Sequence, residues 1–154
     1  MVGIRAAESK SDWATARELF QEYAASLGFD LSFQDFEREV ASLPGDYASP
    51  GGVVLLARDD HAAAGCVALR PLAVETCEMK RLYVRPSHRG TGVGKRLADA
   101  ILVEGRARQY RRMRLDTVPG MEAAIALYRA LGFREIEAYR ANPIPGAIFM
   151  EREL

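Results

Sequence analysis

The sequence predicts an α/β (α+β) fold in which a mixed, mostly antiparallel central sheet of about seven strands is flanked on both faces by about four helices. Two observations predict it. Short apolar runs alternate with longer segments whose apolar residues recur at helical spacing, in the order β-α-α-β-β-β-α-β-α-β-β. No repeat, low-complexity tract or linker interrupts the chain, so we expect residues 1–154 to form a single domain.

The N-terminal part is predicted to be strand, helix, helix. Alternating apolar residues over 2–6 indicate a strand, and Ser9 with Asp12 resembles a capping box at the start of a helix that Gly28 ends. The apolar stripe of this helix is Trp13, Ala16, Phe20, Tyr23, Ala24 and Leu27. The second helix repeats the pattern with Ser32 and Asp35 as capping signal, Phe33, Phe36, Val40 and Leu43 as stripe, and Pro44-Gly45 as its end.

The middle of the chain is predicted to be antiparallel. A buried-strand run at 53–57 is followed by a polar turn at 58–61 and a return strand at 64–69. Pro71 is expected to break that strand before another begins at Cys77 and runs to Val84.

The C-terminal half continues with helix, strand, helix and two strands. After Pro86 a glycine turn leads into a helix whose apolar face is Val93, Leu97, Ala98, Ile101, Leu102 and Gly105. The remaining elements are expected at 112–117 (strand), 122–131 (helix), 134–139 (strand) and 147–151 (strand).

Composition and charge restrict the class of protein. Lys and Arg total 21, and so do Asp and Glu, so no net charge favours nucleic acid or an anionic membrane. No apolar run is long enough to span a bilayer, and the first five residues do not suit a signal peptide. We therefore expect a cytoplasmic protein. The arginines between 106 and 114 are interpreted as solvated, with a contact to a 3′-phosphate as the alternative.

The two cysteines are too few for a disulfide framework and too far apart for a metal-binding knuckle. We interpret Cys66 and Cys77 as buried thiols, with a bridge across neighbouring strands as the less favoured alternative. His61 and His88 are interpreted as loop residues, since neither has a Ser, Cys or carboxylate arrangement that reads as a catalytic triad or a metal site. No metal site is expected.

The turn Arg89-Gly90-Thr91-Gly92-Val93-Gly94 has the composition of a phosphate-binding loop. Free N–H groups and the positive end of the dipole at a helix N-terminus attract anions, and glycines let the backbone approach a pyrophosphate. Lys95 adds positive charge. A Walker A loop is excluded because its first glycine would fall on Arg89, and a dinucleotide fingerprint because its third glycine would fall on Lys95.

Two motifs together identify a family resemblance. The turn matches Arg/Gln-x-x-Gly-x-Gly/Ala between a strand and an amphipathic helix, and the segment from Leu127 to Phe133 matches Leu-Tyr-x-x-x-Gly-Phe. Both resemble the hallmarks of the GNAT acetyltransferases, which use acetyl-CoA. The element order resembles that family over almost the whole chain, and the motif identity spans about Glu78 to Phe133.

The resemblance implies how acetyl-CoA would be held. In the family, the amides of the turn bind the pyrophosphate of CoA, which here assigns Arg89, Gly90, Thr91, Gly92, Val93, Gly94 and Lys95. The pantetheine arm pairs with the strand before the turn, which assigns Leu82, Tyr83 and Val84. The next strand, ending at Thr117, would diverge and open the slot, and an N–H near Leu82 or Val84 would stabilise the developing oxyanion.

Transfer of acetyl to an amine requires a neutral nucleophile and a proton for the leaving thiolate. The resemblance makes Tyr128 the candidate acid, while helical periodicity alone allows a core tyrosine. Glu78 is the candidate base; period-two alternation places it on the face of Leu82 and Val84, where apolar neighbours would raise its pKa towards neutrality. A surface glutamate is the alternative, and a water relay can replace a dedicated base.

One departure from the family pattern concerns Met121, which stands three residues before Ala124 where many members carry Asn. We expect direct acetyl transfer to a primary amine of a small molecule or polypeptide. An acyl-CoA sensor or partner-docking protein is the alternative. The segments 28–31 and 138–146 are expected to shape the acceptor site, and the sequence leaves open whether the chain forms a homodimer.

Overall fold

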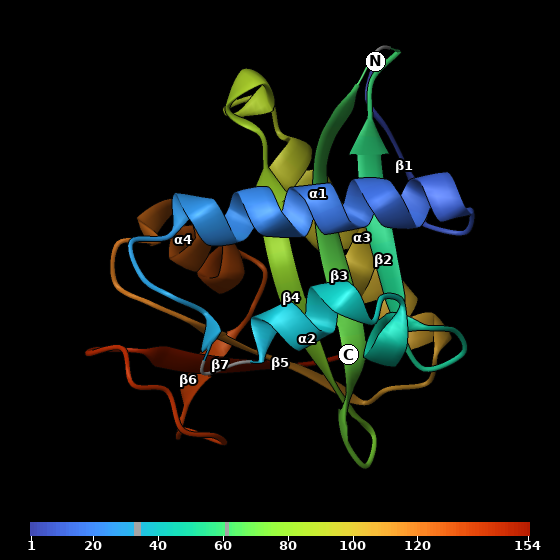
Figure 1. The fold of residues 1–154 in the computed structure, drawn as a ribbon. Coiled ribbons are helices and arrows are strands. Elements are labelled where there is room, and N and C mark those ends of the chain that lie inside the picture. The colour runs from blue at the N-terminus through green and yellow to red at the C-terminus, as the bar shows by residue number, and fades with distance from the viewer. Residues whose placement is uncertain (33–34, 61) are drawn as a thin grey trace.

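The computed structural model describes residues 1–32, 35–60 and 62–154. Its strands form one seven-stranded sheet in the order β1-β2-β3-β4-β5-β7-β6 (Figure 1). All neighbouring strands are antiparallel except β4 and β5, which are parallel. The strands are β1 Gly3–Ala6, β2 Val53–Arg58, β3 Ala63–Ala73, β4 Thr76–Val84, β5 Arg112–Thr117, β6 Arg134–Ile136 and β7 Ile148–Glu153. The α-helices are α1 Lys10–Ser26, α2 Phe36–Ala41, α3 Val93–Ala107 and α4 Glu122–Ala130, with short 3₁₀ turns η2 Gly45–Tyr47 and η3 Pro86–His88. The predicted fold class and element order are confirmed.

The capping box at the start of α1 is confirmed, whereas the second capping signal is wrong. Ser9 Oγ accepts from the Asp12 backbone N–H, and the Asp12 carboxylate accepts in return from the Ser9 backbone N–H. Asp35 is itself the residue preceding α2, has a positive φ of 54°, and makes no side-chain cap. Phe33, expected in the stripe of α2, lies outside the described residues, as does His61.

Two strands differ in length from the prediction. β3 continues through Pro71 to Ala73, because β2 begins at Val53, opposite Leu69, and leaves this end of β3 with a neighbour on one side only. A proline costs no ladder hydrogen bond on such an edge. β6 ends at Ile136 rather than at residue 139, because the following chain leaves the sheet and sends Tyr139 towards Glu78.

The sheet separates two apolar cores. In Figure 1, α1 and α2 cross one face of the sheet and α3 lies behind the other. The α3 core includes Cys77 and Met79, whereas the α1–α2 core includes Cys66 and Tyr83. Cys66 and Cys77 are therefore buried free thiols on opposite faces, which confirms the predicted thiols and excludes the alternative bridge.

A bulge in β4 changes which side chains share a face. Cys66 pairs with Tyr83 and Ala68 with Lys80, so β4 has one residue more than β3 over this stretch. The backbone accommodates the extra residue at Arg81, which has a φ of +60°. Odd-numbered residues before the bulge, and even-numbered residues after it, face α3.

The predicted face of Glu78 is therefore wrong. Leu82 and Val84 pack against the α3 core together with Met79, so simple alternation back from Leu82 fails at the bulge. Glu78 lies on the other face, towards α1 and α2. The physical reason is the extra residue, which reverses the side-chain alternation along the strand.

The parallel strands β4 and β5 pair only at their beginnings. Their register covers Thr76 to Glu78 against Arg112 to Arg114, while β5 continues to pair with β7 as far as Thr117. The second half of β4 thus has β3 on one side and no strand partner among the described residues on the other. This confirms the predicted divergence of the two strands.

Asp12, at the start of α1, links this helix to the sheet through β1 and β2. It is buried and accepts from the guanidinium groups of Arg5 at 2.9 Å and Arg58 at 3.1 Å, and from the Glu8 backbone N–H. The hydrogen bond from Arg5 and those from the backbone hold the pKa of Asp12 well below its usual range. A group with a lowered pKa in the folded state stabilises the protein above its ordinary pKa and loses this contribution as the pH falls.

We therefore expect Asp12→Ala to lower the free energy of unfolding at pH 7 by about 1–2 kcal/mol, the usual cost of losing a helix cap. The difference from wild type should shrink as the pH falls below about 4, because the Asp12 carboxylate protonates there in the unfolded chain but stays ionised in the folded protein. Urea unfolding at several pH values measures both effects. Asp99→Ala removes an exposed pair with Lys95 and should cost under about 0.5 kcal/mol; equal losses for the two variants would contradict this account.

Candidate functional site

A hollow of about 450 Å³ lies between the unpaired half of β4 and the start of α4. β4 supplies its floor, the end of α1 one wall, and the segment entering α4 the other. The lining surface is mostly apolar. The lining residues are Tyr23, Ser26, Leu82, Tyr83, Val84, Arg89, Gly94, Gly120, Met121, Glu122, Ala123, Ala124 and Leu127.

The glycine turn at one end of this hollow leaves the start of α3 uncovered. Gly90 and Gly92 have φ values of +75° and +86°, which favour glycine, and no atom lies within 4 Å of where a Cβ would stand on either. Gly92 precedes α3 and no side chain caps that helix. The first N–H groups of α3 are therefore uncapped by side chains and face an open turn.

Arg89 is held across the end of β4. Its Nε donates to the Val84 carbonyl at 3.0 Å, and its guanidinium lies 6.0 Å from the centre of the Tyr83 ring. Thr91 Oγ1 donates to the His88 carbonyl, which closes the turn on the opposite side. Lys95 is exposed and pairs with Asp99 one helical turn further on.

The structure brings together only part of the predicted cofactor set. Leu82, Tyr83, Val84, Arg89 and Gly94 line the large hollow. Thr117 instead lines two smaller hollows. The predicted residues outside the lining are Gly90, Thr91, Gly92 and Lys95 in the turn and first turn of α3, and Val93, which is buried in the α3 core.

A narrow hollow of about 40 Å³ occupies the gap where β4 and β5 diverge. Tyr128 lies on its wall, 7% exposed, with its ring edge-on to Phe133 at 5.9 Å between centroids. Burial raises the pKa of Tyr128, so its hydroxyl stays protonated and can donate. The full lining is Tyr23, Met79, Lys80, Arg81, Leu82, Leu115, Asp116, Thr117, Met121 and Tyr128.

Glu78 lies near this gap in a different environment from the predicted one. Its side chain is fully buried and accepts from Arg70 Nε at 3.0 Å and from the Tyr139 hydroxyl at 2.7 Å, while Arg140 Nη2 lies 2.5 Å from its Oε2. Burial by itself would raise the pKa of Glu78, but Lys80, Arg140 and Arg70 outweigh it and the pKa is lowered. The prediction of a pKa raised towards neutrality is wrong.

Lys80 is a titratable residue of the gap that sequence reasoning missed. It is 5% exposed and lines the narrow hollow beside Tyr128. Burial, and then the charge of Arg81, lower the pKa of Lys80 to about 7. Lysines are usually exposed, so the position of Lys80 inside the strand predicted over 77–84 was the signal in the sequence that could have identified it.

Tyr23 and Met121 were assigned no site role from the sequence, yet each lines three hollows. They border the large hollow, the narrow one and an outer one of about 30 Å³. Met121, the residue that departs from the family pattern, thus lies where the three hollows adjoin. The outer hollow is lined by Tyr23, Leu27, Phe29, Leu31, Asp116, Thr117, Val118, Met121 and Asn142.

His88 has partners that the sequence did not indicate. Its Nδ1 lies 2.8 Å from Ser87 Oγ, and its Nε2 lies 2.8 Å from Asp59 Oδ2. The sequence did not indicate these two contacts, and His88 lies in the short η3 turn between β4 and the glycine turn. Ser87 is exposed and borders none of the four hollows described here, so these contacts tie the β2–β3 turn to the chain before the glycine turn.

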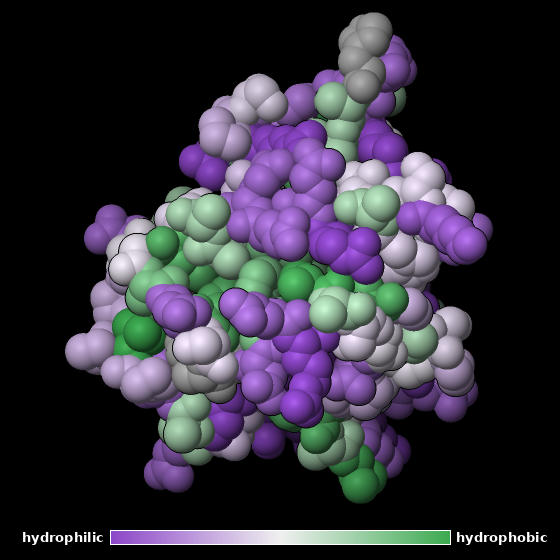
Figure 2. All heavy atoms as spheres, viewed as in Figure 1, coloured by the Kyte–Doolittle hydropathy of each residue, from purple (hydrophilic) through white to green (hydrophobic). Residues whose placement is uncertain are grey.

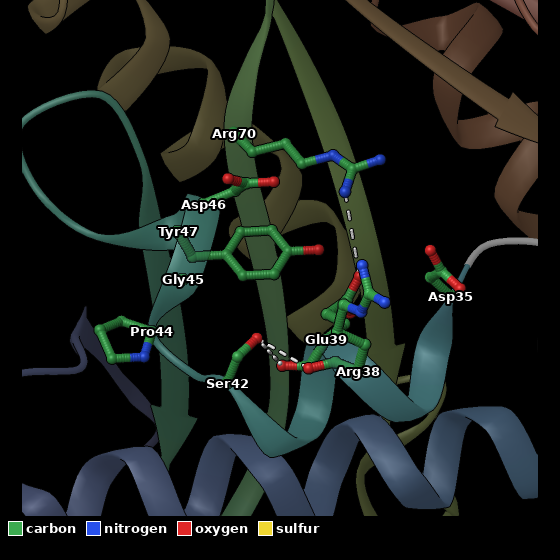
Figure 3. A pocket seen from close by; sticks show the side chains of 9 residues that line it. All are labelled: Asp35, Arg38, Glu39, Ser42, Pro44, Gly45, Asp46, Tyr47 and Arg70. Carbon is green, nitrogen blue, oxygen red and sulfur yellow. Dashed lines mark hydrogen bonds and ion pairs between the residues drawn. The ribbon is translucent and has the colours of Figure 1, made fainter.

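A further hollow of about 390 Å³ lies under α2, away from the glycine turn (Figure 3). Glu39 stands at its inner side and pairs with Arg81 Nε at 2.8 Å. The Tyr47 hydroxyl points towards the side where Arg70 and Glu39 lie and has no hydrogen-bond partner within the described part of the chain. None of its lining residues is shared with the other three hollows, which separates it from the gap between β4 and β5.

Two properties of the described residues bear on metals and membranes. Over residues 1–32, 35–60 and 62–154 no three His, Cys, Asp or Glu side chains gather in a way that could hold a metal ion. In the same ranges no helix combines the length and apolarity needed to cross a bilayer.

Comparisons with known proteins agree with the fold and the two motifs. Residues 13–133 match the model of the acetyltransferase (GNAT) family. An N-acetyltransferase of Schizosaccharomyces pombe is 39% identical over 99% of this chain and 95% of its own length.

Solved structures show the same architecture. A GNAT acetyltransferase from Staphylococcus aureus superposes with a TM-score of 0.79 at 21% identity, covering 99% of both chains. An acetyltransferase from Salmonella typhimurium, solved with acetyl-CoA, gives 0.70 at 21% identity over 99% of this chain and 93% of its own. The chain therefore belongs to the GNAT family of N-acetyltransferases.

Proposed function

We propose that the protein transfers the acetyl group of acetyl-CoA directly to a primary amine within a ternary complex. The observation that carries the proposal is the continuity of the hollows. The large one beside the glycine turn shares Tyr23, Leu82 and Met121 with the narrow one, which shares Tyr23, Asp116, Thr117 and Met121 with the outer one. The three hollows therefore adjoin at Tyr23 and Met121, and we infer that the two substrates meet there.

Acetyl-CoA fits the large hollow by its chemistry. The uncapped N–H groups at the start of α3 and the guanidinium of Arg89 suit a pyrophosphate. The unpaired edge of β4 over Leu82 to Val84 suits the amides of the pantetheine arm, which need partners once they leave water. The Salmonella relative with bound acetyl-CoA supports the same ligand for this chain.

The transfer requires two kinds of help. The amine nitrogen attacks the thioester carbonyl carbon, the C–N bond forms, and the C–S bond breaks. Tyr128 is the candidate proton donor to the leaving sulfur. Its raised pKa makes it a weaker acid, but the hydroxyl stays protonated and can donate a hydrogen bond to the departing thiolate. Backbone N–H groups of β4 near Leu82 stabilise the oxyanion.

Two residues, Glu78 and Lys80, are candidates for the base that removes the proton of the amine. Glu78 stays a candidate base, but its lowered pKa and its two arginine partners make it a weak one. Lys80 titrates closer to neutrality. The charged and titratable groups that act on Lys80 are Glu78 and Arg81 on β4, Arg70 on β3 and Asp116 on β5, and Tyr23 and Tyr128 share its hollow.

A sensor that binds acyl-CoA without turnover is the alternative function, and Met121 at the usual Asn position is the observation that favours it. Incubation with acetyl-CoA and a panel of amines, followed by a free-thiol assay, distinguishes the two. Amine-dependent thiol release supports the transferase. Tight CoA binding with no release on any amine favours the sensor.

Gly92→Asp tests the phosphate turn. A residue with a Cβ at a φ of +86° costs about 1–2 kcal/mol, and the added carboxylate repels the pyrophosphate. We expect CoA affinity, measured by calorimetry, to fall more than about tenfold. Gly3→Asp, at an exposed glycine with open space around it, should bind CoA like wild type; unchanged affinity in Gly92→Asp would exclude the turn as the binding site.

Tyr128→Phe tests the proton donor. Loss of a positioned acid usually costs about 10²-fold or more in rate, so kcat should fall by that order while CoA affinity stays within about twofold. Tyr110→Phe is the matched control, because that hydroxyl donates to the Gly51 carbonyl away from the site. A wild-type rate for Tyr128→Phe would make Tyr128 a packing residue only.

The pH dependence of kcat/KM tests the two candidate bases. A group with a pKa of about 7 gives an activity limb near neutral pH, whereas a carboxylate with a lowered pKa is already ionised there. We expect a limb near pH 7 that persists in Glu78→Gln and disappears in Lys80→Met. Disappearance of the limb in Glu78→Gln, with Lys80→Met unchanged, would restore Glu78 as the titrating base.

A further inference from the structure

The outer hollow is small, about 30 Å³, and its lining has the chemistry that suits the ammonium end of an organic cation with an apolar body. It adjoins the narrow hollow at Asp116 and Thr117, so a group placed in it points towards the gap between β4 and β5. Five of its lining residues are apolar: Leu27, Phe29, Leu31, Val118 and Met121. In Figure 2, apolar surface gathers beside the chain that leaves α1, between hydrophilic surfaces.

Asp116 is the one charged residue among the described lining residues of this hollow. It lies on β5 and accepts from Asn142 Nδ2 at 3.2 Å, while Asn142 Oδ1 accepts from the Ile144 backbone N–H at 3.0 Å. The segment between β6 and β7 thus fixes the orientation of the carboxylate. One carboxylate oxygen of Asp116 thus accepts a hydrogen bond from Asn142, whose side chain is itself positioned by Ile144. The other carboxylate oxygen accepts no hydrogen bond from any described residue.

The surrounding charges leave Asp116 as the group that would attract a cation. Glu39 is paired with Arg81 in a two-point contact, and Glu78 is paired with Arg70 and Arg140. Asp116 forms no ion pair with a described residue, and Lys80 close by is held at a lowered pKa. A carboxylate in an apolar wall is stabilised by a cation that brings its own apolar surface.

We propose that the acceptor is a primary amine at the end of an apolar group that carries no carboxylate beside the nitrogen, with its ammonium bound by Asp116 before it is deprotonated. The inference rests on the proposed acetyl transfer and specifies its substrate class. A carboxylate next to the amine would be brought against Asp116 and into an apolar wall, both of which are unfavourable. Overall, one ammonium and one thioester give one amide, one thiol and one released proton.

The test uses two amines that differ by one carboxylate, 2-phenylethylamine and phenylalanine. With wild-type protein and acetyl-CoA, we expect kcat/KM, from thiol release and mass spectrometry of the product, to be at least about tenfold higher for 2-phenylethylamine. Asp116→Asn, which keeps the shape of the side chain, should raise KM for 2-phenylethylamine and shrink the preference. Asp46→Asn, in the separate hollow under α2, should change neither.

The outcomes separate the inference from the proposed function. Equal or better use of phenylalanine, or a preference that Asp116→Asn leaves intact, would overturn the acceptor class. Acetylation of a peptide N-terminus, where the nitrogen stands beside a polar peptide group and not on an apolar body, with no use of 2-phenylethylamine, would also overturn it and leave the transferase standing. Absence of transfer to every amine, with CoA bound, would overturn both.

Discussion

Arg81 places an extra residue in β4 at the point where β4 and β5 begin to separate, and the rest of the site depends on this interruption. A non-glycine residue with a φ of +60° costs of order 1–2 kcal/mol. The side chain offsets that cost, because it is buried, forms a two-point contact with Glu39 and lies 5.1 Å from the Phe36 ring. α2 therefore stabilises the distortion in the strand beneath it.

The bulge has two consequences for chemistry. It reverses the alternation of side chains, so that Leu82 and Val84 face the α3 core while Lys80 and Glu78 face α1 and α2. It also coincides with the loss of pairing to β5, which leaves the edge of β4 available to a ligand. The close approach of β3 to β4 beside the bulge also requires glycine at position 65, because a Cβ on Gly65 would lie 2.4 Å from the Tyr83 carbonyl oxygen.

Charge in the interior is distributed unevenly around the gap. Glu39 and Glu78 are neutralised by arginines from three parts of the chain, which makes them structural in their present contacts. Burial instead lowers the pKa of Lys80 to about 7 and raises the pKa of Tyr128, so it favours the uncharged form of each side chain. In the proposed mechanism, proton transfer in the gap therefore depends on Lys80 and Tyr128, whose charged forms are disfavoured by burial. Binding of a cation depends on Asp116, which forms no ion pair with a described residue.

The sequence by itself determined the element order, the capping box at Ser9, the glycine turn and the motif around Tyr128, because each depends on local spacing or local backbone chemistry. It could not determine the face of Glu78, the pKa of Lys80, or the contacts of His88. A single extra residue on a strand leaves no periodic signal, and a pKa depends on charges that arrive from Arg70, Arg140 and Asp116 through tertiary contacts. The tertiary structure alone decided which of the predicted residues meet at one point, because only packing brings the end of α1, the divergence of β4 from β5 and the entry to α4 together.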